Sequence, residues 1–205
     1  NNIDLDSRFA NKWVTFSAIE VLNLAEGGIS IFDALKSDLI FIIGSAVSDE
    51  NPITDYLIRA AASDRRKTLI IAHQRRIKMD SSASLSLRYK PGDEGEIIKR
   101  AIDFIENNPP IPLGTDLKSV PTKGGEGGLF KGDMSQVGEK FKDAKNITMF
   151  LGADILRLDN GTEAITNIAA LKELLKKAGK HIIVQPLFDR CNQRGARAMG
   201  IHPLF

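Results

Sequence analysis

Four short, almost wholly apolar segments constrain the fold of this chain more than any other feature. They cover residues 38–44, 68–73, 146–152 and 180–186 and are rich in isoleucine, leucine and valine. Because their apolar residues follow one another with little alternation, each segment is typical of a strand that is covered on both faces. Strands of this kind occur mainly in parallel sheets with a layer of helices on either side.

Helical patterns lie between these segments. Apolar residues recur at helix spacing over residues 53–62, 94–105 and 162–178, and Ser30 is placed to cap a further short helix. Gly179 follows the last pattern, where glycine commonly ends a helix. Strands that alternate with helices predict an α/β fold, in which a doubly wound, mainly parallel sheet carries helices on both faces.

The chain is predicted to form one α/β domain over residues 1–205, built from two βα halves. The halves cover about residues 30–106 and about residues 133–205. Between them, residues 107–131 contain four prolines and five glycines. Because these residues disfavour both helix and strand, we expect the segment to be a long mobile loop or an insertion.

Composition excludes several classes of function. The formal net charge is +2 and no basic stripe is interleaved with aromatic residues, so we expect no nucleic-acid partner. No apolar run approaches the roughly 18 residues of a membrane span, so we expect no direct insertion into a membrane. The single cysteine, Cys191, leaves neither an internal disulfide nor a four-thiolate iron–sulfur site, and a cytoplasmic location fits best.

Candidate binding residues lie where the predicted strands end. Gly44 and Ser45 follow the first strand, and Gly152 follows the third. Glycine allows a tight turn with close backbone approach, and a serine hydroxyl can bind a phosphate. Since ligands of parallel sheets bind outside the carboxyl ends of the strands, we expect the two glycine turns to border one crevice. The geometry of the turns alone also explains the glycines.

Three further candidates come from other predicted turns. Arg75 follows the second strand, Asp93 is placed to cap the next helix, and Asn192 follows the last strand. A turn and a helix cap account for Asp93 without any ligand. No catalytic residue and no metal site is predicted, because the histidines are scattered and neither a Walker loop nor a nucleophile elbow is present.

Several segments together resemble the molybdopterin oxidoreductase family. Within that family they look most like the large iron–sulfur subunits of NADH–quinone oxidoreductases, or respiratory complex I. The matching segments are residues 1–4, 37–45 with Asn51-Pro52, 69–76, 87–93 and 192–200. They are spread over most of the chain outside the segment rich in proline and glycine.

In members that bind the molybdenum cofactor, the first strand usually ends in Gly-Ser-Asn and the second in Asp-Pro-Arg. The matching positions here are Gly44-Ser45-Ala46 and His73-Gln74-Arg75. The resemblance therefore implies a nucleotide pocket without the asparagine amide and without the ribose-binding carboxylate, whose charge-assisted contact a neutral histidine does not reproduce. The candidates for such a vestigial cofactor site are Gly44, Ser45, Arg75, Asp93, Gly152 and Asn192.

The family's cysteine-rich region, which carries its iron–sulfur clusters, has no counterpart in this chain. The resemblance thus implies a non-catalytic scaffold domain, without a cofactor of its own, from a longer subunit that does carry iron–sulfur clusters. That subunit would pass electrons from NADH towards quinone beside other subunits of the peripheral arm, at the cytoplasmic side of a membrane-bound complex.

Two alternatives remain open. One is a fragment of an active molybdopterin-dependent oxidoreductase similar to formate dehydrogenase, which would need a bound molybdopterin guanine dinucleotide. The other is an unrelated, doubly wound module for nucleotide binding or protein interaction.

Overall fold

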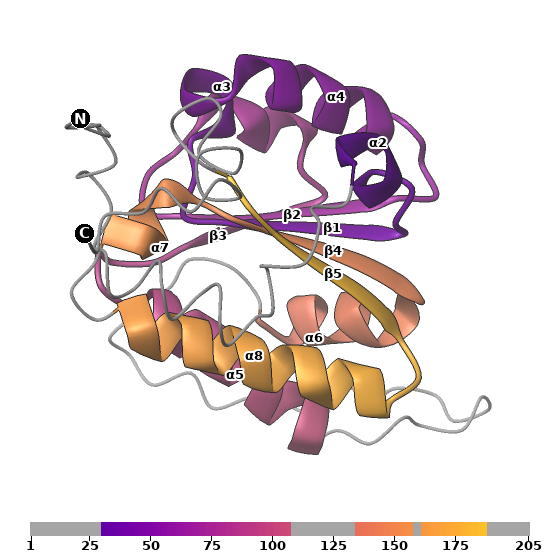
Figure 1. Cartoon of the computed structure of the whole chain (residues 1–205), viewed down its shortest axis with the longest axis vertical. Helices are drawn as coiled ribbons and strands as arrows, with labels where there is room; N and C mark the ends of the chain where they lie inside the picture. The colour runs from indigo at the N-terminus through magenta and orange to yellow at the C-terminus, as the bar shows by residue number, and fades with distance from the viewer. Residues whose placement is uncertain (1–29, 108–133, 158–160, 188–205) are drawn as a thin grey trace, which may run out of the picture.

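A computed structural model describes residues 30–107, 134–157 and 161–187. Within these ranges, five parallel strands form one sheet in the order β3-β2-β1-β4-β5 (Figure 1). The strands are β1 (Leu39–Ile43), β2 (Thr68–His73), β3 (Leu85–Arg88), β4 (Asn146–Leu151) and β5 (His181–Pro186). The chain winds outward from β1 to β3 and then returns to place β4 on the other side of β1. The strand order therefore reverses between β1 and β4, which is the usual position of a ligand site in such sheets.

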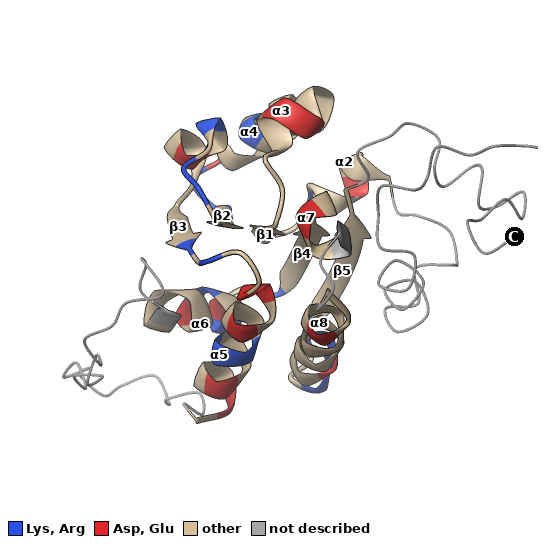
Figure 2. Cartoon of the chain, turned by 90° about the vertical axis from the view of Figure 1, so that its left-hand side faces the viewer, with Lys and Arg blue, Asp and Glu red and all other residues tan. Residues whose placement is uncertain are grey.

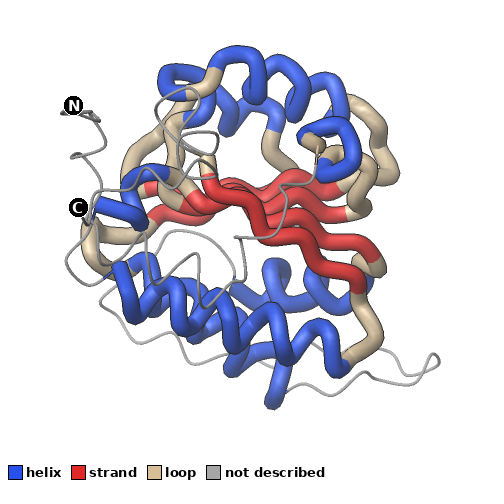
Figure 3. The backbone as a smooth tube through the Cα atoms, viewed as in Figure 1, coloured by secondary structure: helices blue, strands red, loops and turns tan. Residues whose placement is uncertain are grey.

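Helices cover both faces of the sheet (Figure 3). One layer holds α2 (Ile31–Ala34), α3 (Val47–Glu50), α4 (Pro52–Ala62) and the 3₁₀ helix η1 (Lys78–Ser82). The opposite layer holds α5 (Glu94–Asn107), α6 (Met134–Asp143) and α8 (Gly161–Lys177). The short α7 (Ala153–Arg157) follows β4 directly. The predicted α/β fold, a parallel sheet between two helical layers, is confirmed.

The central strand explains why both layers are needed. Leu39, Phe41 and Ile43 of β1 belong to the core on the α5, α6 and α8 side, whereas Ile40 and Ile42 belong to the core on the other side. All five side chains are almost completely buried. Because burial of one such side chain contributes about 1.5–3 kcal/mol, either face left bare would remove much of the stability of the domain.

The sequence located most elements of the described ranges correctly. The four predicted strands and the three long helical patterns are present within two residues of their expected ends. Ser30 caps α2, since its hydroxyl oxygen accepts a hydrogen bond from the Phe32 N–H at 3.3 Å. Gly179 ends α8 with a φ of 77°, a left-handed conformation that glycine adopts without strain.

Three features differ from the prediction. Residues 85–88, which the sequence analysis did not assign to a strand, form β3 at the edge of the sheet. Asn107, assigned to the loop, is the last residue of α5, and the rest of the 107–131 segment lies outside the described residues. Ile53 and Tyr56 belong to the apolar pattern of α4, yet they point outward and are 78% and 70% exposed. None of the described helices is long and apolar enough to cross a membrane.

Candidate functional site

The carboxyl ends of the parallel strands meet at one edge of the sheet, which Figure 2 shows from the side of α7. Five of the six predicted site residues follow or lie close to these strand ends: Gly44, Ser45, Arg75, Asp93 and Gly152. Asn192 lies outside the described residues. We call this part of the molecule the carboxyl edge.

The two glycine turns are neighbours, as β1 pairs with β4. Gly44 has a φ of 69°, and its carbonyl oxygen accepts a hydrogen bond from the Asp154 N–H at 3.1 Å. The Gly152 N–H donates to the Ile43 carbonyl at 2.8 Å. A Cβ atom at Gly152 would lie only 1.8 Å from the Gly44 carbonyl oxygen. The turns therefore contact one another backbone to backbone, and glycine at position 152 is what allows it.

Ser45 is fully buried, and its hydroxyl has a partner within the chain. The hydroxyl donates a hydrogen bond to Oε2 of Glu50 at 2.6 Å. Glu50 is the last residue of α3, a helix of four residues whose N-cap, Ala46, makes no side-chain capping bond. A carboxylate thus occupies the hydroxyl that the sequence analysis assigned to a phosphate.

His73 ends β2 and is 3% exposed. Its Nδ1 accepts a hydrogen bond from the Arg75 N–H at 3.1 Å, so a neutral ring carries its proton on Nε2. That Nε2 lies 3.7 Å from Oδ2 of Asp154 at the start of α7. Burial lowers the pKa of His73, although the charge of Asp154 acts in the opposite direction. His73 is therefore a neutral side chain between the turns that follow β2 and β4.

Glu94 begins α5 and is fully buried. Its Oε1 accepts a hydrogen bond from Gln74 Nε2 at 2.9 Å, whereas Oε2 has no hydrogen-bond partner among the described residues. Burial raises the pKa of Glu94 in spite of the bond from Gln74. Burial also raises the pKa of Tyr89, and the charges of Glu94 and Asp154 act in the same direction. The buried part of this edge therefore favours uncharged acids.

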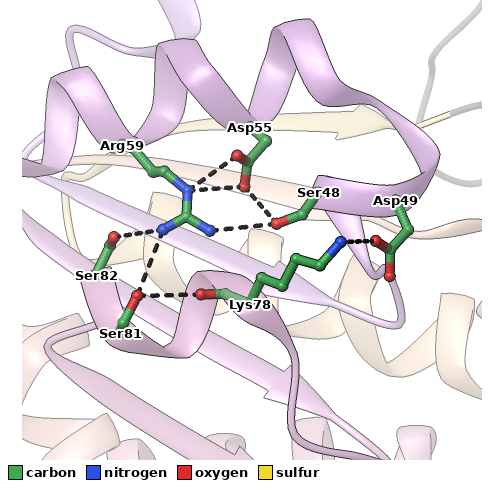
Figure 4. A network of polar contacts seen from close by, with 7 residues as sticks. All are labelled: Ser48, Asp49, Asp55, Arg59, Lys78, Ser81 and Ser82. Atoms are coloured by element: carbon green, nitrogen blue, oxygen red, sulfur yellow. Dashed lines mark hydrogen bonds and ion pairs between the residues drawn. The ribbon is translucent and has the colours of Figure 1, made fainter.

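An arginine-centred network holds the helices next to this edge (Figure 4). Arg59 Nε donates to both carboxylate oxygens of Asp55, at 2.9 and 3.0 Å. Its two terminal nitrogens reach Ser82 Oγ at 2.9 Å and Ser48 Oγ at 3.2 Å. Since Ser48 belongs to α3 and Ser82 to η1, Arg59 joins the segment after β1 to the connection between β2 and β3.

These residues do not fit the phosphate and ribose of a nucleotide cofactor. The Ser45 hydroxyl is held by Glu50, and the Gln74 amide is held by Glu94. Carboxyl groups therefore lie where an anion would need donors, and like charges repel. Among the described residues, no group of three or more His, Cys, Asp or Glu side chains is placed to hold a metal ion.

Sequence reasoning missed four residues of this edge: Glu50, Tyr89, Glu94 and Asp154. The sequence does carry a signal for Glu94, because it lies three and four positions before Ile97 and Ile98 in the apolar stripe of α5, on the buried face. For Asp154, the partners come from other strands, so its local sequence gives no signal.

A depression in the described part of the chain lies away from this edge. It has a volume of about 380 Å³ and is lined by Asp33, Lys36, Ser37, Asn146, His181 and Ile183. These residues belong to α2 and to the amino-terminal ends of β4 and β5 or their approaches. None of the predicted site residues lines it.

No known protein-family model matches this chain. Among curated proteins, it is 29% identical over 209 residues to the G 2 subunit of NADH-quinone oxidoreductase from Rhizobium meliloti, which covers 99% of this chain and 24% of the relative. It is 24% identical over 220 residues to the alpha subunit of NADPH-Fe(3+) oxidoreductase from Geobacter sulfurreducens, with 98% of this chain and 26% of the relative covered. The chain thus spans about a quarter of the length of these relatives.

Among solved structures, the fold is similar to that of acetylene hydratase from Pelobacter acetylenicus. The TM-score is 0.56 at 15% sequence identity, and the match covers 78% of this chain and 24% of that one. Identity at this level shows a shared fold only. With the sequence matches, it confirms the resemblance that the sequence motifs predicted: this chain is similar to the molybdopterin oxidoreductase family and, within it, to the large subunit of NADH–quinone oxidoreductase.

Proposed function

We propose that this chain is a scaffold domain of the large iron–sulfur subunit of an NADH–quinone oxidoreductase and that its nucleotide pocket is vestigial. The longer subunit would carry the iron–sulfur clusters and contact other subunits of the peripheral arm, on the cytoplasmic side of a membrane-bound complex. The match to the Rhizobium meliloti subunit over 99% of the chain supports this assignment.

One observation carries the vestigial pocket: the polar side chains of the carboxyl edge are bound to the chain's own acids. Ser45 donates to Glu50, and Gln74 donates to Glu94. His73, at the position of the family's ribose-binding carboxylate, is a buried neutral ring facing Asp154. A nucleotide would have to break these contacts and approach several carboxyl groups, both of which weaken binding.

Metal and nucleotide analysis of the purified chain tests the pocket. We expect neither molybdenum nor iron by elemental analysis and only weak binding of GMP by calorimetry. About one molybdenum atom per chain, or tight binding of GMP, would show that the cofactor site works and is not vestigial.

Copurification tests the scaffold role. The tagged chain, expressed in cells that contain an NADH–quinone oxidoreductase, should enrich other peripheral-arm subunits over a similarly tagged, unrelated doubly wound domain. Equal recovery of those subunits with both baits would contradict the role.

The match to the alpha subunit of NADPH-Fe(3+) oxidoreductase favours a second candidate, a domain of an active oxidoreductase subunit. A domain that binds a molybdopterin guanine dinucleotide would need donors for its phosphates. Molybdenum in the purified chain supports this candidate, and its absence together with weak GMP binding supports the first.

A further inference from the structure

We propose that Glu50 and Glu94 act as internal anions, which occupy the donors of the carboxyl edge and thereby exclude phosphate groups. This inference rests on the vestigial pocket proposed above and names the residues responsible for it. Glu50 holds the Ser45 hydroxyl at 2.6 Å, and Glu94 holds the Gln74 amide at 2.9 Å.

The position of the two donors makes them the relevant ones. Ser45 follows the turn after β1, and Gln74 follows β2, which is the neighbouring strand. Both therefore lie at the carboxyl ends of adjacent parallel strands, where a phosphate would approach this type of sheet. Ser45 is fully buried, so Glu50 is the group that satisfies its hydroxyl away from solvent.

The two acids act by occupation as well as by charge. A phosphate oxygen and a glutamate oxygen compete for the same hydroxyl hydrogen of Ser45, because a hydroxyl donates only one. Glu94 uses Oε1 on Gln74, while Oε2 remains buried without a partner among the described residues. An arriving phosphate would meet this second carboxyl oxygen, an acceptor when ionised, and would gain no donor from it.

The neighbouring acids provide matched controls. Asp49 lies next to Glu50 in α3, but it is half exposed and pairs with Lys78 Nζ at 2.8 Å. Glu96 lies in the first turn of α5 beside Glu94, but it pairs with Arg100 Nε at 3.0 Å and is 43% exposed. Neither holds Ser45 or Gln74, so each control removes a nearby negative charge without freeing a donor.

The test uses the whole chain and two probes, inorganic phosphate and GMP, followed by nuclear magnetic resonance titration. Glu50→Gln removes the charge and keeps an acceptor, whereas Glu50→Ala also frees the hydroxyl. We expect wild type to bind both probes weakly and Glu50→Ala to bind them at least about tenfold more tightly, with a smaller gain for Glu50→Gln. Glu94→Gln should add to the gain of Glu50→Ala, and Ser45→Ala in the Glu50→Ala background should remove that gain.

The controls are Asp49→Asn, Glu96→Gln and the neutral nucleoside guanosine. The first two should leave phosphate binding within about twofold of wild type, and Glu50→Ala should not strengthen guanosine binding. If Asp49→Asn strengthens phosphate binding as much as Glu50→Ala does, occupation of Ser45 is not the cause and the inference is wrong. The same holds if folded Glu50→Gln and Glu50→Ala both bind phosphate as weakly as wild type, which leaves the vestigial pocket itself standing. Tight phosphate or GMP binding by wild type overturns both proposals.

Discussion

Replacement of Gly152 by alanine tests whether the two turns at the carboxyl edge are in direct contact. The added Cβ would lie 1.8 Å from the Gly44 carbonyl oxygen, 2.1 Å from the Gly44 carbonyl carbon and 2.4 Å from the Ser45 nitrogen. All three are backbone atoms, so no side-chain rotation relieves the clash. Strands β1 and β4 would have to separate at their carboxyl ends.

The cost follows from these contacts. An ordinary carbon–oxygen contact is about 3.4 Å, so the backbone must move by more than 1 Å, and overpacking of this kind costs about 1–3 kcal/mol. The movement also strains two hydrogen bonds, from Gly152 N–H to the Ile43 carbonyl and from Asp154 N–H to the Gly44 carbonyl. Each contributes about 0.5–1.5 kcal/mol. We therefore expect Gly152→Ala to lower the free energy of unfolding by about 3 kcal/mol or more, or Tm by about 6–12 °C.

Urea and thermal unfolding of wild type and variant measure this effect, with Gly95→Ala as the matched control. Gly95 is a helical glycine in α5, and a Cβ there would meet its nearest atom, Asn167 Nδ2, at 3.4 Å. Because alanine favours a helix over glycine, the control should be neutral or more stable by up to about 1 kcal/mol. A loss of less than about 1 kcal/mol in Gly152→Ala would refute the close contact of the two turns.

The remaining predictions concern the rest of the described structure. Arg59→Met breaks the network between α3, α4 and η1 and should lower the free energy of unfolding by about 2 kcal/mol in urea unfolding, whereas Arg66→Met, which breaks an exposed pair, should have no measurable effect. Glu94→Gln should gain stability relative to wild type between about pH 5 and about pH 8, because burial raises the pKa of Glu94 and the wild type loses stability as pH rises through that pKa; a pH-independent difference in urea midpoints would contradict this. Tyr56→Ser should change the urea midpoint little, since this side chain is 70% exposed.

The sequence predicted the central part of the fold because the signal there is local. Residues 38–44 are apolar almost throughout, and a run of this kind fits a strand covered on both faces. The edge strand β3 lacks such a run. Residues 84–88 alternate serine with leucine and end in arginine, a pattern that five residues carry too weakly to separate from a turn. Burial follows the same rule: α4 was predicted correctly, but its apolar pattern alone did not show that Ile53 points outward.

The candidate site was predictable in place and not in chemistry. The topology of a doubly wound sheet places Gly44 and Gly152 on one edge, and pairing of β1 with β4 makes them neighbours. The partners of the polar groups depend on side-chain conformation in three dimensions. Glu50 reaches back five residues to Ser45, and His73 lies close to Asp154, which is 81 positions further along the chain. No periodicity encodes such contacts.

Internal partners for the carboxyl edge also bear on stability. A domain that has lost a nucleotide keeps buried donors that the ligand once satisfied, and each unsatisfied buried group costs about 1–3 kcal/mol. On the proposal above, the acids that exclude phosphate also satisfy those donors: Glu50 serves the Ser45 hydroxyl, and Glu94 serves the Gln74 amide. The same substitution should then have opposite effects on the two properties. Glu50→Ala should strengthen phosphate binding and, in the absence of phosphate, weaken the fold, because it leaves the hydroxyl of the fully buried Ser45 without an acceptor. Saturating phosphate should return part of that loss in Glu50→Ala and none in wild type, since a ligand stabilises only the state that binds it. Thermal unfolding of both proteins with and without phosphate measures this, and equal phosphate stabilisation of the two would separate exclusion from satisfaction and refute their common origin.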